Sequence, residues 1–173
     1  MKSSTLMVLA ATIATGCGAT VHSTTSPTAN LSQYRTYSFF TPPNQQGKPE
    51  SMADQEIRSA LRQDLAAKGL TEAKNGAPDF LISHHVSKQQ QLEVDDAGYW
   101  GYGFGPGFAT TYTEGTLIVD FIDPTTKKVF WRGSASEAMN DPNNVNPQKL
   151  DAAISKLVNQ YPYTVASTPR QGM

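Results

Sequence analysis

The sequence predicts an α+β fold, a two-layer sandwich in which a mainly antiparallel sheet of about four strands carries two helices on one face. Two amphipathic helical patterns stand far apart in the chain, and β-branched and aromatic segments separated by turn residues lie between them. The predicted order is strand, helix, strand, strand, strand, helix. The apolar sides of both helices would cover one face of the sheet, and the other face would meet water or a partner.

The chain begins with a segment typical of a bacterial signal peptide. After Lys2, residues 6–15 are apolar or small, a run about half the roughly 20 residues that a membrane-spanning helix needs. Residues 14–17 read Ala-Thr-Gly-Cys, which resembles the lipobox of bacterial lipoproteins with Ala14 where Leu is usual. We therefore expect removal of residues 1–16 and lipidation of Cys17, the only cysteine. The alternative is a plain signal peptide with an incidental cysteine.

Three further boundaries follow from composition. Residues 17–32 are small and polar, so we expect a lipidated, flexible tether. A single α+β domain would occupy residues 33–163, and a disordered tail residues 164–173. The domain would open with a strand over residues 34–40, because this stretch is rich in aromatic residues and is followed by two prolines.

The first helix is predicted over residues 52–68. Ser51 can cap its start, and Asp54 completes an approximate capping box. Gly69 supplies a left-handed C-terminal cap. Apolar residues recur between these ends at a spacing of four: Ile57, Leu61 and Leu65.

Three strands are predicted after this helix. The first covers residues 79–87 and could extend toward Val94, the second covers about 110–122, and the third covers 128–137. Turn-forming residues at 123–127 join the last two into a hairpin. A final helix begins at the cap Asn146 with a proline in its first turn, and it ends before Pro162.

Charge argues against a nucleic-acid partner. The formal net charge is −1 at pH 7 and becomes −2 when Lys2 leaves with the signal peptide. A chain this close to neutral, with no cluster of Lys and Arg, has no basic field to attract a polyanion.

Several segments, in this order, resemble an uncharacterised family of bacterial envelope lipoproteins that is defined by a domain of unknown function, DUF4136. The matching segments are residues 34–37, 65–70, 78–82, 114–120, 131–133 and 161–162. The resemblance implies an envelope lipoprotein domain with no established activity. It supplies no catalytic residue for transfer to this chain.

Potential catalytic and metal-binding residues were assessed separately. His84 and His85 are adjacent, but successive strand residues point to opposite faces and cannot readily bind one ion. We expect one of them to face the core with a hydrogen-bond partner and the other to be exposed. Motifs for a serine nucleophile, a zinc protease or a phosphate-binding loop are missing. The sequence therefore predicts no catalytic residue, no metal and no cofactor.

Trp131 and Arg132 should lie on opposite faces of one strand. We expect Trp131 in the core and Arg132 on the open face. There Arg132 could bind an anion or a partner, or it could pair with a cross-strand carboxylate.

Residues 98–112 combine glycines with many aromatic residues. Exposed aromatic side chains bind proteins, glycans and lipid interfaces, so we take Trp100, Tyr102 and Phe104, with Arg132, as a partner-contact surface. The alternative is that these aromatic residues pack against the domain as a covering loop.

The sequence thus predicts a lipoprotein anchored in the cell envelope, on the periplasmic face of the outer membrane because Gly18 replaces the Asp that commonly retains lipoproteins at the inner membrane. Its partners would be membrane lipid and an envelope protein or glycan, and its role non-catalytic binding or assembly. The alternative is a hydrolase or glycan-processing enzyme with its site on the open sheet face. A pocket uniting Glu114, Asp120, His84 or Arg132 would favour the enzyme.

Overall fold

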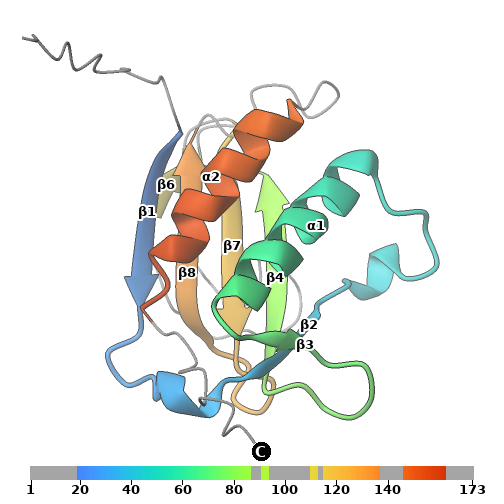
Figure 1. The fold of residues 1–173 in the computed structure, drawn as a ribbon, viewed down its shortest axis with the longest axis vertical. Coiled ribbons are helices and arrows are strands. Elements are labelled where there is room, and N and C mark those ends of the chain that lie inside the picture. Colours follow the sequence, from blue (N-terminus) through green and yellow to red (C-terminus); the bar gives the residue numbers. More distant parts are fainter. Residues whose placement is uncertain (1–18, 87–90, 94–109, 113–114, 137–145, 163–173) are drawn as a thin grey trace, which may run out of the picture.

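The computed structural model describes residues 19–86, 91–93, 110–112, 115–136 and 146–162 (Figure 1). Two helices, α1 (Met52–Ala67) and α2 (Pro147–Asn159), lie side by side on one face of a six-stranded sheet. The sheet has the order β1-β8-β7-β4-β2-β3. Its strands are β1 (Thr20–Thr25), β2 (Thr36–Phe39), β3 (Thr71–Glu72), β4 (Phe80–Val86), β7 (Leu117–Ile122) and β8 (Val129–Ser136). Two short 3₁₀ helices, η1 (Leu31–Gln33) and η2 (Pro43–Gln45), flank β2.

The predicted α+β class with two helices is confirmed, but the four-stranded, mainly antiparallel sheet is wrong. The sheet has six strands and is mixed, because β2 runs parallel to both β3 and β4. Helix α1 lies between β2 and β3 in the chain, and such a crossover returns the chain in the same direction. The predicted hairpin between β7 and β8 is confirmed, with Asp123 N–H donating to the Lys128 carbonyl across the turn.

The predicted flexible tether is also wrong over part of its length. Residues 20–25 form β1, which pairs with β8 from Thr20 opposite Ser136 to Thr25 opposite Trp131. Four of its six side chains are exposed, since β1 is an edge strand with little apolar surface to bury. An edge strand of this composition looks like a linker in the sequence.

The main core lies between the helices and the sheet. Residues on alternating positions of β4, β7 and β8 meet the apolar faces of both helices, and Trp131 is fully buried as predicted. Helix α2 crosses β8 so closely that a Cβ on Gly133 would lie 2.6 Å from Cδ1 of Leu157. Glycine at this position therefore sets the distance between the two layers.

The second face of the sheet is buried as well, whereas the sequence analysis expected it to face water or a partner. Ile118, Asp120 and Ile122 on β7 and Arg132 on β8 are all buried. The sequence of β7, LIVDFI, is an almost continuous apolar run, which is typical of a strand buried on both faces. This signal was present in the sequence.

The strand predicted over residues 110–122, the first strand of the hairpin, is divided at Gly115, whose φ of 76° favours glycine. β4 is described as far as Val86, and residues 87–90, toward which the prediction extended it, lie outside the described residues. Two short strands, β5 (Gln91–Glu93) and β6 (Thr110–Tyr112), pair antiparallel in a separate sheet. Within the described residues, no helix is long and apolar enough to cross a membrane.

Candidate functional site

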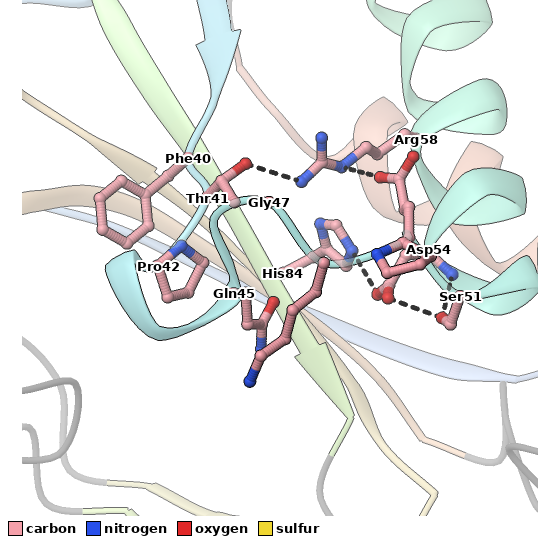
Figure 2. A pocket seen from close by; sticks show the side chains of 12 residues that line it. Phe40, Thr41, Pro42, Gln45, Gly47, Ser51, Asp54, Arg58 and His84 are labelled. Carbon is pink, nitrogen blue, oxygen red and sulfur yellow. Dashed lines mark hydrogen bonds and ion pairs between the residues drawn. The ribbon is translucent and has the colours of Figure 1, made fainter.

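A cavity of about 520 Å³ lies where the loop after β2, the first turns of α1 and strand β4 meet (Figure 2). Its size is within the range of small-molecule sites in proteins. It is lined by Phe40, Thr41, Pro42, Gln45, Gly47, Lys48, Pro49, Glu50, Ser51, Asp54, Arg58 and His84. These residues come from three separate segments that the fold brings together.

Asp54 is the centre of this site. Its Oδ1 lies 3.1 Å from Nε2 of His84, and Ser51 Oγ donates a hydrogen bond of 2.6 Å to its Oδ2. The hydrogen bond from His84 outweighs partial burial and, with that from Ser51, lowers the pKa of Asp54 to about 2. Asp54 is therefore ionised at physiological pH, and its side chain is still 43% exposed toward the cavity.

His84 is held in one tautomer by this arrangement. Because the Asp54 carboxylate can only accept, Nε2 must carry a proton, and neutral His84 then has a bare acceptor at Nδ1. Its side chain is 6% exposed, and Nδ1 is buried with no hydrogen-bond partner in the part of the chain that the structure describes. The predicted hydrogen-bond partner of one histidine is confirmed, since His84 meets Asp54, but His84 lines the cavity. His85, expected to be exposed, is instead half-buried.

On the other side of the cavity, Arg58 of α1 contacts the loop formed by residues 41–50. Its Nε lies 2.8 Å from Glu50 Oε1, and its Nη2 donates to Thr41 Oγ1 at 3.5 Å. The guanidinium also lies 5.0 Å from the centre of the Phe39 ring, within reach of a cation–π interaction. The geometry thus fixes the position of residues 41–50 relative to α1.

The cavity combines charges that cancel. Lys48 and Arg58 balance Glu50 and Asp54 when His84 is neutral. Donors and acceptors are both plentiful, and Phe40 adds an aromatic wall (Figure 2). This chemistry suits a neutral ligand with many hydroxyl groups, since each hydroxyl both donates and accepts.

The site lacks the arrangement of a serine hydrolase. Ser51 Oγ donates to Asp54 and accepts from the Asp54 backbone N–H at 3.1 Å, so it caps α1. A nucleophilic serine would hydrogen-bond to the histidine, with the aspartate on the far side of the ring. Among the described residues, no group of three or more His, Cys, Asp or Glu side chains could hold a metal ion.

The predicted site residues fall elsewhere. Cys17, Trp100, Tyr102 and Phe104, together with Glu114, lie outside the described residues, and their roles stay predictions.

Arg132 forms a buried pair with Asp120, with distances of 2.6 Å from Nε to Oδ1 and 2.7 Å from Nη2 to Oδ2. This geometry favours the cross-strand pairing considered in the sequence analysis, and the contact of Arg132 with a partner stays a prediction. Asp120 and Arg132 lie on the sheet face opposite His84.

Arg58 and Glu50, which pair at the wall of the cavity, were not predicted from the sequence. Arg58 belongs to the predicted surface of α1, and Glu50 to a loop, and neither position carries a motif. Ser51 and Asp54 were recognised, but only as a helix cap. The spacing of Ser51, Asp54 and Arg58 does place all three near one end of α1, which was the available signal.

A scan against family models matches the domain of unknown function DUF4136 over residues 21–163. The chain belongs to the DUF4136 family. Its predicted resemblance to this family is thereby confirmed. The matched range includes nearly all of β1, in agreement with the place of this strand in the domain.

Solved structures share this DUF4136 fold. A DUF4136 family protein from Bacteroides thetaiotaomicron is 17% identical, with a TM-score of 0.57 over 84% of this chain and 97% of that chain. A PDZ domain protein from Parabacteroides distasonis is 18% identical, with a TM-score of 0.52 over 85% of this chain and 37% of that one. No curated protein matches the chain. At these identities the likeness shows the fold alone.

Proposed function

We propose that this DUF4136 protein is a lipoprotein of the bacterial envelope, anchored through Cys17 on the periplasmic face of the outer membrane. Its domain acts as a non-catalytic binding module, and the cavity around Asp54 is its binding site. The ligand is a neutral, hydroxyl-rich molecule such as a short saccharide.

One observation carries the binding role: an ionised Asp54 that remains 43% exposed is held between His84 and Ser51 at the wall of a cavity. A carboxylate fixed by two neighbours keeps the same position before and after a ligand arrives, so little ordering is needed on binding. The pairing of Arg58 with Glu50 fixes the opposite wall in the same way. The balanced charges disfavour a strongly charged ligand.

The lipid anchor is supported by the apolar run at residues 6–15 and the lipobox-like sequence Ala-Thr-Gly-Cys at residues 14–17. Cys17 stands three residues before Thr20, where β1 begins. Three extended residues span about 10 Å, so lipidation of Cys17 would hold the domain directly against the bilayer. Several acyl chains, at ~0.8 kcal/mol per buried methylene, would make this attachment lasting.

The anchor is tested by metabolic labelling with a clickable palmitate analogue, followed by membrane fractionation. We expect label and membrane association in the wild type and neither in Cys17→Ser. An unlabelled wild type would remove the anchor from the proposal and leave the binding module to be tested on its own.

The binding role is tested by saturation-transfer NMR on the chain carrying Cys17→Ser. Cellobiose serves as the neutral probe, with glucuronic acid and glucosamine as anionic and cationic sugars. We expect cellobiose to bind best, and Asp54→Asn to weaken its binding about tenfold, the effect of losing roughly 1.4 kcal/mol.

The matched control is Asp64→Asn, the same change on the same helix but outside this cavity. It should leave binding unchanged. Preference for a charged sugar, or equal losses in both variants, would contradict the proposed ligand class.

A further inference from the structure

The outer edge of β1 exposes a row of backbone groups. The Ser26 N–H donates to the Phe130 carbonyl of β8 at 2.9 Å. Every second residue before Ser26 also directs its backbone N–H and C=O toward β8: Thr24, His22 and Thr20. In an antiparallel pair the intervening residues direct their N–H and C=O groups the other way. Gln160 confirms this assignment, because its Nε2 donates to the Val21 carbonyl at 3.2 Å. Val21, Ser23 and Thr25 therefore present their backbone groups to the open side of the sheet.

Within its described residues, β1 itself carries none of the features that usually protect an exposed edge against pairing. Proteins prevent exposed edge strands from pairing with other strands by means of charged side chains, proline, bulges or very short strands. β1 has six residues, TVHSTT, with no Lys, Arg, Asp, Glu or Pro, and its pairing with β8 runs without a register shift. The opposite edge strand, β3, has only two residues. The difference singles out β1 as the edge that can accept another strand.

We propose that β1 pairs antiparallel with β1 of a second copy of the chain, joining two sheets into one continuous sheet. With a two-fold axis at Ser23, Val21 of each copy lies opposite Thr25 of the other. The outward backbone groups from Val21 to Thr25 then form about six hydrogen bonds. The Val21 carbonyl accepts from Thr25 of the other copy in addition to Gln160 or in its place.

The second copy fits this edge because β1 is complementary to itself. The strand has no side chain of fixed charge, so a pair of identical strands brings no like charges together. Its Thr and Val residues also favour extended pairing. A shared bilayer would raise the local concentration of anchored copies, so that a low affinity between the two strands is enough for dimerisation. The pairing itself does not depend on the anchor.

The test is sedimentation equilibrium of the full mature chain with Cys17→Ser, without detergent. Ser23→Pro removes only an N–H that points away from β8, and proline is tolerated at such edge positions. We expect reversible dimers in the parent chain, at least tenfold weaker dimerisation in Ser23→Pro, and no change in the matched control Ser23→Ala. Thermal unfolding followed by circular dichroism checks that Ser23→Pro is folded.

A second measurement fixes the register and does not depend on a proline variant folding. In the Cys17→Ser background, Ser23→Cys places one thiol from each copy at the two-fold axis, about 5.5 Å apart between Cα atoms, which a disulfide can span. Thr20→Cys thiols would lie ~20 Å apart and serve as the control.

Oxidation should cross-link Ser23→Cys and not Thr20→Cys. A parent chain that stays monomeric, together with a Ser23→Cys variant that gives no cross-link, would overturn the proposal. Unchanged dimers in a folded Ser23→Pro would also overturn it.

Discussion

Two carboxylate pairs lie on opposite faces of the same sheet, and they differ in burial. On the face away from the helices, Asp120 and Arg132 form a two-point pair in which both side chains are almost fully buried, at 3% and 4% exposure. On the helix face, Asp54 meets His84 through a single contact and remains 43% exposed. Both pairs include a residue of the sheet, and the second lines the cavity described above.

The difference indicates separate roles. A buried ion pair is a poor surface for a ligand, because binding there would require both groups to be exposed again. A half-exposed carboxylate contributes little to folding and keeps hydrogen-bonding capacity for a ligand. We therefore assign Asp120 and Arg132 to stability, and Asp54 to binding.

The largest expected effect comes from breaking the buried pair. Asp120→Ala should lower the free energy of unfolding by about 3–5 kcal/mol, because it removes one partner of a buried, two-point ion pair. Urea unfolding measures the loss. The double variant Asp120→Leu/Arg132→Met should recover much of it, since it removes both charges. If Asp120→Ala is as stable as wild type, the two pairs do not differ in the way proposed.

The fold was predictable where local chemistry determines it. Residues 52–68 were predicted as a helix, and α1 spans Met52–Ala67. Both predicted caps are formed, with Ser51 accepting from the Asp54 N–H and Asn146 from the Lys149 N–H. These features depend on residues within one turn of each other, so a local sequence pattern is enough to predict them.

Strand pairing was less predictable because it depends on distant segments. Nothing within residues 20–25 indicates that they pair with a strand more than a hundred residues away, and their polarity is that of a linker. The direction of β2 likewise depends on where α1 returns the chain. For the site, His84 was expected to have a partner, but its identity as Asp54 follows only from the packing of α1 over β4.

A smaller effect is expected from Asp54→Asn, and it should depend on pH. Because its folded-state pKa of about 2 lies below the ordinary 3.8, ionised Asp54 stabilises the fold above that ordinary value, and the contribution is lost as the pH falls toward 2. Solvent screening of this half-exposed group limits the effect to about 1 kcal/mol at neutral pH.

Urea unfolding of wild type and Asp54→Asn between pH 2 and 7 measures this contribution. The stability difference should be largest above pH 4 and shrink toward pH 2. A difference that stays constant over this range would mean that the lost contribution is not the ionised carboxylate.

The smallest effect is expected from Glu50→Gln, which removes the ionic partner of Arg58 at the rim of the cavity. Glu50 is 37% exposed, and exposed pairs contribute about 0–1 kcal/mol, so unfolding should change little. Ligand binding should change more than stability, because Arg58 would then be held only by Thr41 and the Phe39 ring. Cellobiose titration and urea unfolding of the same variant separate the two effects. A loss of stability comparable to that of Asp120→Ala would mean that Glu50 and Arg58 stabilise the fold, as Asp120 and Arg132 do. The proposed binding role would then depend on Asp54 and His84.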